Sequence, residues 1–258
     1  MRIFRISLIL IGVFFLPAAM WGAPSGGNQI GSDLTVESVR DSLSSQFQRV
    51  EDFQVQVHVY VEMPQLRMPR KQIDLAFKQP DLTRIETSGF AVAPRTGLVM
   101  SPENLMNNFR EILTIEEGMF EDKRHILIHG EVYADSLQAP VQGMSGEEGT
   151  VNTKLWIDPH RWVIRRMESR LDTTRFLELS VDYTEVESGI WLPSETEFTF
   201  FMPENMQFSG HDAPIPDVRN QGQSTQNSSH GTIRMTFRGY RVNLGLKERF
   251  FDRETSKY

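Results

Sequence analysis

Two histidines, His125 and His129, have the spacing in this chain that would best suit metal chemistry. They lie an even number of positions apart, so on a strand their side chains would share one face with Leu127 between them. Zinc bound by two imidazoles needs a further protein ligand. No carboxylate is spaced with this pair, and His160 and the His211-Asp212 pair fall in segments that we expect to be loops. We therefore predict polar strand positions here and no metal site.

The sequence also shows no motif that is typical of covalent or acid–base catalysis. The chain has no cysteine, which excludes thiol chemistry and disulfides, and it has no Gly-x-Ser-x-Gly turn. It also lacks a glycine-rich phosphate loop. A glycosidase would need two carboxylates opposed across a cleft, whereas the closely spaced acids are expected in turns or on solvated strand faces: Glu116 and Glu117, Glu147 and Glu148, Glu195 and Glu197. We predict that the protein is not an enzyme and uses no cofactor, with a hydrolase as the least favoured alternative.

The charge balance argues against nucleic acid as a partner. The chain has 27 basic and 34 acidic residues and a net charge of −7. Loss of Arg2 and Arg5 with an N-terminal signal would bring the charge to about −9. An acidic protein is repelled by phosphate backbones and by anionic lipid surfaces.

The N-terminus, residues 1–25, has the pattern of a secretory signal peptide. Arg2 and Arg5 precede an apolar run over residues 6–16, and a stretch with Pro17 and small residues follows. The apolar run is short for a membrane span, although an uncleaved anchor is the alternative. Without a cysteine the exported chain cannot be lipidated. We expect a soluble periplasmic protein, a linker over residues 26–33, and a single domain over residues 34–258.

Alternating apolar and polar residues predict a β-rich domain. Residues 53–63 alternate without interruption, with Phe53, Val55, Val57, Val59 and Val61 on one face. Residues 71–79 repeat the pattern with Ile73, Leu75 and Phe77, and the two segments predict a hairpin. Further strands are expected over residues 125–132, 151–157, 163–169, 175–185, 196–201 and 232–243. About nine strands with short connections indicate an antiparallel meander.

Two helices and one long loop complete the predicted organisation. Residues 34–50 carry apolar side chains at steps of three and four, which predicts an amphipathic helix capped by Ser32 or Asp33. From residue 85 the alternation of apolar and polar residues becomes irregular, and residues 102–113 predict a short helix. Its apolar side, which could serve as a lid, includes Leu105, Met106, Phe109 and Ile112. Residues 209–229 are rich in Asn, Gln, Ser and Pro and predict a long loop.

The apolar strand faces could enclose a ligand or simply pack together. The 12 methionines and 17 phenylalanines provide adaptable apolar surface, but such residues also fill ordinary cores. If a cavity exists, its predicted wall consists of inward strand positions: Val55, Val57, Val59, Val61, Ile73, Leu75, Phe77, Leu179, Val181, Phe198 and Phe200.

Several short motifs, in this order, resemble those of the LolA-type lipoprotein-sorting carriers. The first is Phe77-Lys-Gln-Pro-Asp-Leu-Thr-Arg-Ile-Glu86, a strand end with a proline, an arginine four residues later and a return strand. Leu155-Trp-Ile-Asp-Pro159 with Val163-Ile-Arg-Arg166 is similar to the central hairpin of that family. Tyr183 with Gly189-Ile-Trp-Leu-Pro193 is similar to its next strand and turn. The closing strand is similar at Phe237, Tyr240, Val242 and Asn243.

This resemblance implies a fold and a function. The fold would be mainly β (α+β): a single, strongly curved antiparallel sheet, a half-barrel, with an N-terminal helix and a helical lid over its concave apolar face. The function would be non-enzymatic transport of acylated lipoproteins or lipids across the periplasm for outer-membrane sorting, by a monomer that exchanges cargo between a membrane donor complex and an outer-membrane acceptor. The alternative is a lipid- or lipoprotein-sensing domain that regulates a partner protein.

One departure from the family pattern concerns release of the cargo. The carriers have an arginine just before the motif proline, which is thought to latch the lid, and this chain has Gln79 there. We therefore consider Arg84 the candidate lid latch.

Overall fold

The computed structural model describes residues 34–63, 66–67, 69–87, 101–133, 150–171, 173–201 and 230–252. All of these residues belong to one compact unit, Ser32–Tyr258. The predicted signal peptide (1–25), the linker (26–33) and the loop at 209–229 lie outside the described residues.

The described chain is mainly β, as predicted. Two α-helices and one short 3-10 helix accompany the strands: α1 (Val36–Gln48), α2 (Pro102–Asn107) and η2 (Glu248–Phe250). The strands are β1 (Asp52–Met63), β2 (Leu66–Arg67), β3 (Lys71–Lys78), β4 (Leu82–Thr87), β5 (Phe109–Phe120), β6 (Lys123–Tyr133), β7 (Thr150–Asp158), β8 (Val163–Leu171), β9 (Thr174–Glu187), β10 (Ile190–Phe201) and β11 (His230–Val242).

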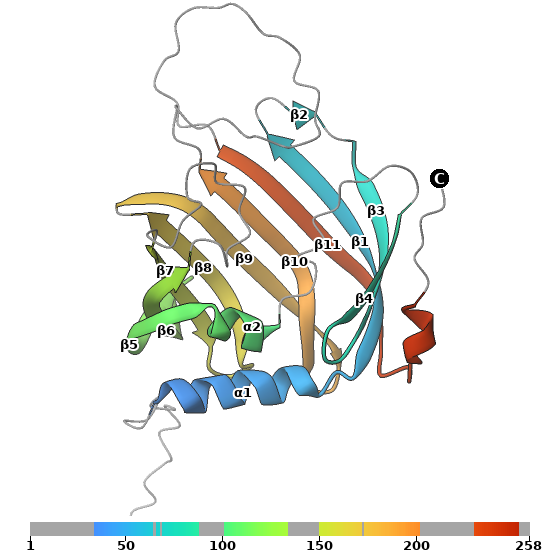
Figure 1. Cartoon of the computed structure of the whole chain (residues 1–258), viewed down its shortest axis with the longest axis horizontal. Coiled ribbons are helices and arrows are strands. Elements are labelled where there is room, and N and C mark those ends of the chain that lie inside the picture. Colours follow the sequence, from blue (N-terminus) through green and yellow to red (C-terminus); the bar gives the residue numbers. More distant parts are fainter. Residues whose placement is uncertain are drawn as a thin grey trace, which may run out of the picture. The chain divides into compact units, whose positions relative to one another are not determined.

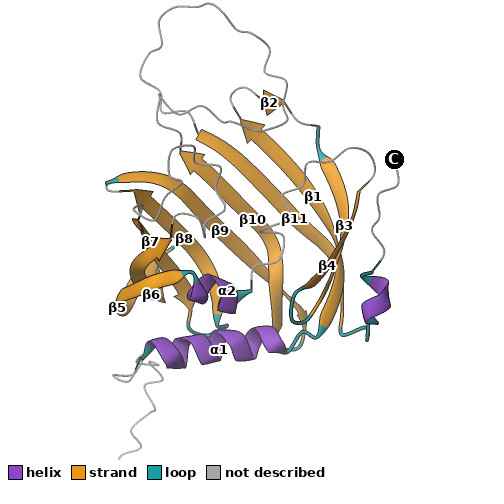
Figure 2. Cartoon of the chain, in the orientation of Figure 1, coloured by secondary structure: helices purple, strands orange, loops and turns teal. Residues whose placement is uncertain are grey.

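The strands form one open antiparallel sheet (Figures 1 and 2). Its order is β4-β3-β1-β11-β10-β9-β8-β7-β6-β5, and β2 pairs with β1 beside this path. The strands from β5 to β11 are neighbours in chain order, and so are β1, β3 and β4. The pairing of β1 with β11 joins these two groups. Within the described chain, β4 and β5 are therefore the two edges of the sheet.

The strand register places the apolar positions on one face. Residues opposite each other in an antiparallel pair share a face. Val61 lies opposite Ile233, which lies opposite Phe198, which in turn lies opposite Leu179. A parallel row runs from Val59 through Met235 and Thr196 to Val181. The alternation seen in the sequence thus becomes a continuous inner face across four strands.

Helix α1 begins with a reciprocal cap at Thr35, which corrects the prediction of Ser32 or Asp33. The Thr35 hydroxyl accepts from the Ser38 backbone N–H, and the Ser38 hydroxyl accepts from the Thr35 N–H. This pattern satisfies two of the four donors that a helix start leaves free. Serine can take the role usually given to glutamate here, so the sequence signal for the cap was weak.

The predicted helix over residues 102–113 is wrong in its second half. Helix α2 ends at Asn107, and Phe109 and Ile112 belong to strand β5. The pairing of β5 with β6 shifts register between Phe109 and Glu111 and again between Ile112 and Thr114. Each shift adds one residue, so Phe109, Ile112 and Ile115 are half-buried at steps of three. A strand with two bulges can therefore imitate a helical pattern.

Other strands are longer than predicted. Strand β10 begins at Ile190 instead of residue 196. Residues 82–87 form β4, the return strand of the first motif, which continues past residue 85 where we expected the pattern to loosen. Pro193 lies within β10 beside a register shift, which explains why this segment was not predicted to be a strand.

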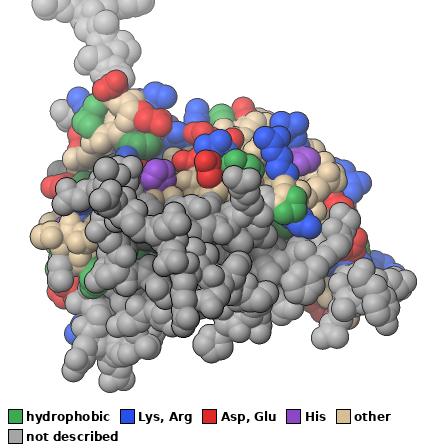
Figure 3. Space-filling view, turned by 90° about the horizontal axis from the view of Figure 1, so that it is seen from above, with side chains coloured by type: hydrophobic (Ala, Val, Ile, Leu, Met, Phe, Trp, Pro, Cys, Tyr) green, Lys and Arg blue, Asp and Glu red, His purple; other side chains and the backbone are tan. Residues whose placement is uncertain are grey.

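The described surface is charged and mixed. Figure 3 shows acidic and basic side chains interspersed over the described part of that view, with scattered hydrophobic ones. None of the described helices combines the length and the apolar character that crossing a membrane would require.

Candidate apolar ligand site

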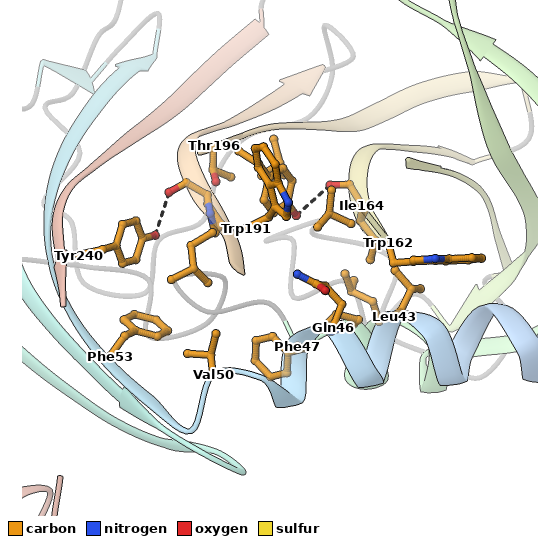
Figure 4. Close-up of a pocket in the computed structure, with 17 residues that line it drawn as sticks. Leu43, Gln46, Phe47, Val50, Phe53, Trp162, Ile164, Trp191, Thr196 and Tyr240 are labelled. Carbon is orange, nitrogen blue, oxygen red and sulfur yellow. Dashed lines mark hydrogen bonds between the residues drawn. The ribbon is translucent and has the colours of Figure 1, made fainter. Parts of the chain in front are cut away.

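A cavity lies between the two α-helices and the inner face of the sheet. Helix α1 contributes Leu43, Gln46 and Phe47 (Figure 4), and α2 contributes Pro102 and Leu105. The other lining residues come from the β1, β8, β9, β10 and β11 strands and from connecting segments: Val50, Phe53, Trp162, Val163, Ile164, Val181, Tyr183, Trp191, Leu192, Pro193, Thr196 and Tyr240.

The lining is suited to an uncharged, apolar ligand. None of the described residues that line the cavity has a charged side chain. Aromatic rings contribute much of the wall, and Figure 4 shows Phe47, Phe53, Trp191 and Tyr240 around the same space. Burial of a charge in such surroundings is costly unless it is paired. The chemistry of the wall therefore favours hydrocarbon and disfavours an ionised group.

The hydroxyl groups of the two tyrosines in the wall donate hydrogen bonds to backbone carbonyls of the protein. Tyr183 donates to the Ile164 carbonyl at 3.0 Å, and Tyr240 donates to the Pro193 carbonyl at 2.8 Å. Both acceptor carbonyls lie beside register shifts of the sheet. Burial raises the pKa of both phenols above the ordinary value. The tyrosines thus remain neutral at ordinary pH and bond to backbone carbonyls beside irregular points of the sheet.

The β7–β8 turn brings Trp162 to the cavity. The Asp158 carboxylate accepts from the backbone N–H groups of His160 and Arg161 at 2.8 and 3.2 Å. Trp162 follows with a φ of 52°, a left-handed conformation that is unusual for a bulky residue. The Arg161 guanidinium lies 4.1 Å from the ring centre of Trp191 on β10. This contact joins the turn to the opposite wall.

The C-terminal end of α1 is hydrogen-bonded to the turn between β9 and β10. Arg49 donates to the Gly189 and Ser188 carbonyls, and Gln46 donates to the Gly189 carbonyl at 3.0 Å. Gly189 has a φ of 71°, and a Cβ there would lie 2.9 Å from Arg49 Nη1. Asn243 also bonds to the Arg49 carbonyl at 3.2 Å. The end of α1 that leads into β1 is therefore fixed.

The cavity is small for a long apolar chain. Its volume is about 70 Å³, enough for roughly five water-sized spheres. Sites that enclose drug-sized ligands measure roughly 300–1,000 Å³. A long chain would therefore need the lining to move apart, and the firm attachment of the C-terminal end of α1 leaves α2 and the other end of α1 as the parts to move.

The predicted wall residues share one face, but most of them belong to a packed core. Val55, Val57 and Val59 pack with β3 residues beyond the cavity, and they are buried. Of the eleven predicted wall positions, Val181 lines the cavity. Contact with a ligand by the others remains a prediction: Val55, Val57, Val59, Val61, Ile73, Leu75, Phe77, Leu179, Phe198 and Phe200.

The predicted lid residues have different surroundings from one another. Leu105 lines the cavity and Met106 is buried in α2. Phe109 and Ile112 lie in β5 and belong to no helix. α2 packs against α1 and so adjoins the cavity from the helical side.

Arg84 lies away from α2. It is opposite Ala76, whereas its neighbour Ile85 is opposite Leu75 on the inner face. Arg84 donates to the Phe250 carbonyl at 2.6 Å, lies over the Phe250 ring and pairs with Glu86. These contacts tie Arg84 to the C-terminal segment on the outer side of the sheet.

Gln79, and not Arg84, contacts the helix that covers the cavity. Its side-chain amide donates to the Phe47 carbonyl, in the last turn of α1, at 3.3 Å. The residue that stands in place of the family's arginine therefore still reaches the helix backbone, through a neutral hydrogen bond.

The cavity residues that the site prediction omitted were present in the motifs. Tyr183, Trp191, Pro193 and Tyr240 belong to the segments that resemble the carriers, and all four line the cavity. Phe47 and Leu43 lie on the apolar side of the predicted first helix. The motif segments contain more of the lining residues than the predicted wall does, because alternation does not distinguish a cavity wall from a packed core.

No metal or catalytic cluster accompanies the cavity in the described residues. Within them, no group of three or more His, Cys, Asp or Glu side chains could hold a metal ion. His125 is buried against Phe120 instead of exposed, and its Nδ1 lies 3.0 Å from the Lys123 carbonyl oxygen. His129 lies opposite Thr114 of β5.

Comparisons with known proteins give matches among solved structures alone. No family model matches the chain. No curated protein sequence matches it either. A domain assigned to outer membrane lipoprotein sorting, from Vibrio parahaemolyticus, aligns with a TM-score of 0.49 and 11% identity over 84% of this chain and 97% of that one. A DUF1329 family protein from Desulfovibrio piger gives 0.49 and 8% over 84% and 97%.

A LolA superfamily protein from Nitrosomonas europaea aligns with a TM-score of 0.45 and 8% identity over 85% of this chain and 98% of that one. Every TM-score among these matches lies below 0.5, so our functional argument rests on the geometry of this chain. The structural neighbours include members of the LolA superfamily, the family that the sequence motifs resemble.

Proposed function

We propose that this protein is an exported, non-enzymatic carrier that holds the apolar chain of a lipid or an acylated lipoprotein in the cavity beneath α1. The observation that carries the proposal is the cavity wall: its side chains come from seven elements and are apolar or aromatic except for Gln46 and Thr196, with no charged member among the described lining residues. The ordered motifs that resemble lipoprotein-sorting carriers and the signal-like residues 1–25 also support it.

The energetics of such a carrier are simple. Each methylene of an acyl chain costs about 0.8 kcal/mol to leave in water, so a soluble carrier must shelter most of the chain. The apolar wall provides that shelter, and the carrier needs no covalent step. Release follows when an acceptor offers the chain a lower free energy than the cavity does.

Entry of a long chain requires an opening of the helical side. Because Arg49, Gln46 and Asn243 hold the C-terminal end of α1, we expect α2 and the N-terminal half of α1 to move apart. Leu105, which comes from α2, would leave the cavity wall in this movement. In this sense α2 serves as the lid, and Gln79 helps to hold the fixed end of α1.

The role in outer-membrane sorting is part of the proposal. A periplasmic carrier of this kind would receive its cargo from a membrane donor complex and deliver it to an outer-membrane acceptor. The absence of cysteine in the whole sequence means that the carrier itself cannot be anchored by a lipid on cysteine.

The first test uses the tryptophans as reporters. Trp162 and Trp191 line the cavity, whereas Trp156 lies between Phe120 and Arg166 outside it. We expect a phospholipid brominated along its acyl chain to quench the fluorescence of the mature wild-type protein. Trp156→Phe should preserve the quenched component, and the double variant Trp162→Phe/Trp191→Phe should remove it. Equal quenching in the double variant would place the chain elsewhere.

The second test identifies the natural cargo. Native mass spectrometry of the mature protein, purified from the periplasm without detergent, should show added mass, and organic extraction should release a lipid or an acylated polypeptide. A clean mass of the polypeptide alone, together with no quenching by the brominated lipid, would exclude the carrier function and leave a packed domain that binds proteins.

A further inference from the structure

Among the described lining residues, Thr196 combines deep burial with a hydroxyl that has no partner. It is 4% exposed, lines the cavity, and lies in the sheet between Val181 of β9 and Met235 of β11. No hydrogen bond joins its hydroxyl to another described residue, and Figure 4 shows it at the cavity without one. Buried hydroxyls in proteins normally have a partner. The hydroxyl proton of Thr196 is therefore available to a ligand.

Other polar side chains of the wall are already bonded within the protein. Tyr183 and Tyr240 donate their hydroxyl protons to backbone carbonyls, so their oxygens can only accept a further hydrogen bond. The Gln46 amide donates to a backbone carbonyl at 3.0 Å. Thr196 differs from these three residues, because its hydroxyl can still donate to a ligand atom.

The position of Thr196 indicates which kind of acceptor fits. The indole N–H groups of the wall belong to Trp162 and Trp191, which are half-buried, whereas Thr196 lies deeper, in an inner-face row whose other members are apolar. A ligand atom bonded to Thr196 would therefore have apolar side chains on both sides. An ionised carboxylate would be costly in such surroundings. The acceptor that fits is a neutral carbonyl oxygen with hydrocarbon attached, as in an acyl ester.

We propose that Thr196 is a specificity-determining residue, which donates a hydrogen bond to the carbonyl oxygen of an acyl ester. This inference rests on the proposed carrier function and adds that the cavity distinguishes an ester-linked chain from other hydrocarbon. An ether-linked chain of the same length has no carbonyl, so it would displace water and leave the hydroxyl unpaired. A site that is built to hydrogen-bond its ligand rejects the analogue that lacks the bonding group.

The unpaired hydroxyl should lower the stability of the ligand-free protein. Valine has nearly the same shape as threonine, with a methyl group in place of the hydroxyl. We expect Thr196→Val to raise the melting temperature of the delipidated protein by about 2–4 °C. Thr199→Val is the matched control, because Thr199 shares the opposite face of β10 with Glu197, and it should change the melting temperature less. A lower melting temperature for Thr196→Val would show that the hydroxyl has a partner within the chain and would overturn the proposal.

The deciding experiment compares diester and diether phosphatidylcholines that have the same chain length. Each lipid competes with the acyl-brominated phospholipid for the mature protein, and the recovery of tryptophan fluorescence gives its affinity. The wild-type protein should bind the diester about fivefold to tenfold more tightly, as the loss of one hydrogen bond predicts. Thr196→Val should bind both lipids equally. Thr196→Ser, which retains a hydroxyl, and Thr199→Val should keep the preference for the diester.

The outcomes separate this inference from the carrier function. Equal competition by both lipids in the wild type, or a preference that Thr196→Val retains, would overturn the role of Thr196 and leave the carrier function in place. No competition by either lipid would count against the carrier function and against this inference with it. A diacylglyceryl-modified peptide as a third competitor distinguishes the two sources of the ester: stronger competition than by the diester phospholipid would indicate a lipoprotein, and weaker competition a phospholipid.

Discussion

The phenol of Tyr240 donates a hydrogen bond of 2.8 Å to the carbonyl of Pro193 on the neighbouring side of the cavity. Pro193 interrupts the regular ladder of β10, because proline has no N–H and the register shifts beside it. The tyrosine therefore stabilises an irregular part of the wall instead of acting on a ligand.

Replacement of Tyr240 by phenylalanine should destabilise the fold and leave the cavity apolar. Removal of one partner from a buried hydrogen bond costs about 1–3 kcal/mol. We expect Tyr240→Phe to lower the free energy of unfolding by that amount in a denaturant titration. Tyr60→Phe, at an exposed position, is the control and should have little effect. An unchanged midpoint for Tyr240→Phe would show that water replaces the phenol.

Alkaline titration should distinguish the two cavity tyrosines from the others. Burial raises the pKa of both Tyr183 and Tyr240 above the ordinary value of 10.0. Because the folded pKa is the higher one, the stability that these neutral phenols contribute is complete below pH 10 and is lost as the pH rises toward the folded values. The phenolate absorbance should therefore develop in two stages, the second together with unfolding.

The matched variant for this titration is Tyr183→Phe/Tyr240→Phe. It should lose the second stage. A single stage in the wild type would mean that the cavity is open to hydroxide and water.

A larger side chain at Val181 should compete with the ligand. Val181 is 2% exposed and lines the cavity, so Val181→Phe would place a ring in space that an acyl chain needs. We expect retention of the brominated lipid to fall at least tenfold with little change in melting temperature. Thr184→Phe, at an exposed position of the same strand, should retain the lipid. Equal retention by both variants would place the ligand outside this cavity.

A buried carboxylate on β8 should make stability depend on acidity. Burial alone would raise the pKa of Glu168, but Arg170, Arg166 and Arg175 hold it below the ordinary value of 4.5. The folded pKa is the lower one, so its contribution is complete above pH 4.5 and disappears as the pH falls through the folded value. Glu168→Gln should cost about 1–3 kcal/mol at neutral pH, and the difference from wild type should shrink in acid. A constant difference would argue against this linkage.

Asp52 should hold the C-terminal segment in place. It is fully buried, and its carboxylate accepts from the backbone N–H groups of Leu244 and Leu246, each at 2.7 Å. Hydrogen bonds to a charged group contribute roughly 1.5–3 kcal/mol. Asp52→Ala should lower stability by at least that amount and increase hydrogen exchange in residues 244–251. Protection that remains as in wild type would assign the anchoring to Arg84 and Phe250.

The sequence predicted those helices and strands in which the spacing of apolar residues matches the side that is buried in the folded chain. Strand β1 alternates strictly because one side faces the core, and the first helix has apolar residues at helical steps. The second half of the predicted lid helix failed because two bulges in β5 bury Phe109 and Ile112 at a helix-like spacing. The cap at Thr35 was missed because its partner is a serine.

The cavity could be predicted only in part, because its wall is assembled from distant segments. Phe47, Trp162 and Tyr240 come from a helix, a turn and a strand that meet only in the folded chain. Periodicity identifies an apolar face but cannot show where that face is packed and where it is hollow. The short motifs contain Tyr183, Trp191 and Pro193, which line the cavity, but the site prediction did not draw on them.

The pairing of β1 with β11 has a consequence for the order of events during synthesis. Phe53 lies opposite Val242, so the centre of the sheet joins segments from opposite ends of the chain. Contacts of such long sequence separation form slowly, because the entropy of closing the loop must be overcome first. While the ribosome is still making the last strands, β1 can pair with β2 and β3 but not yet with β11. The nascent chain therefore cannot complete the centre of its sheet until the last strand, β11, has been synthesised.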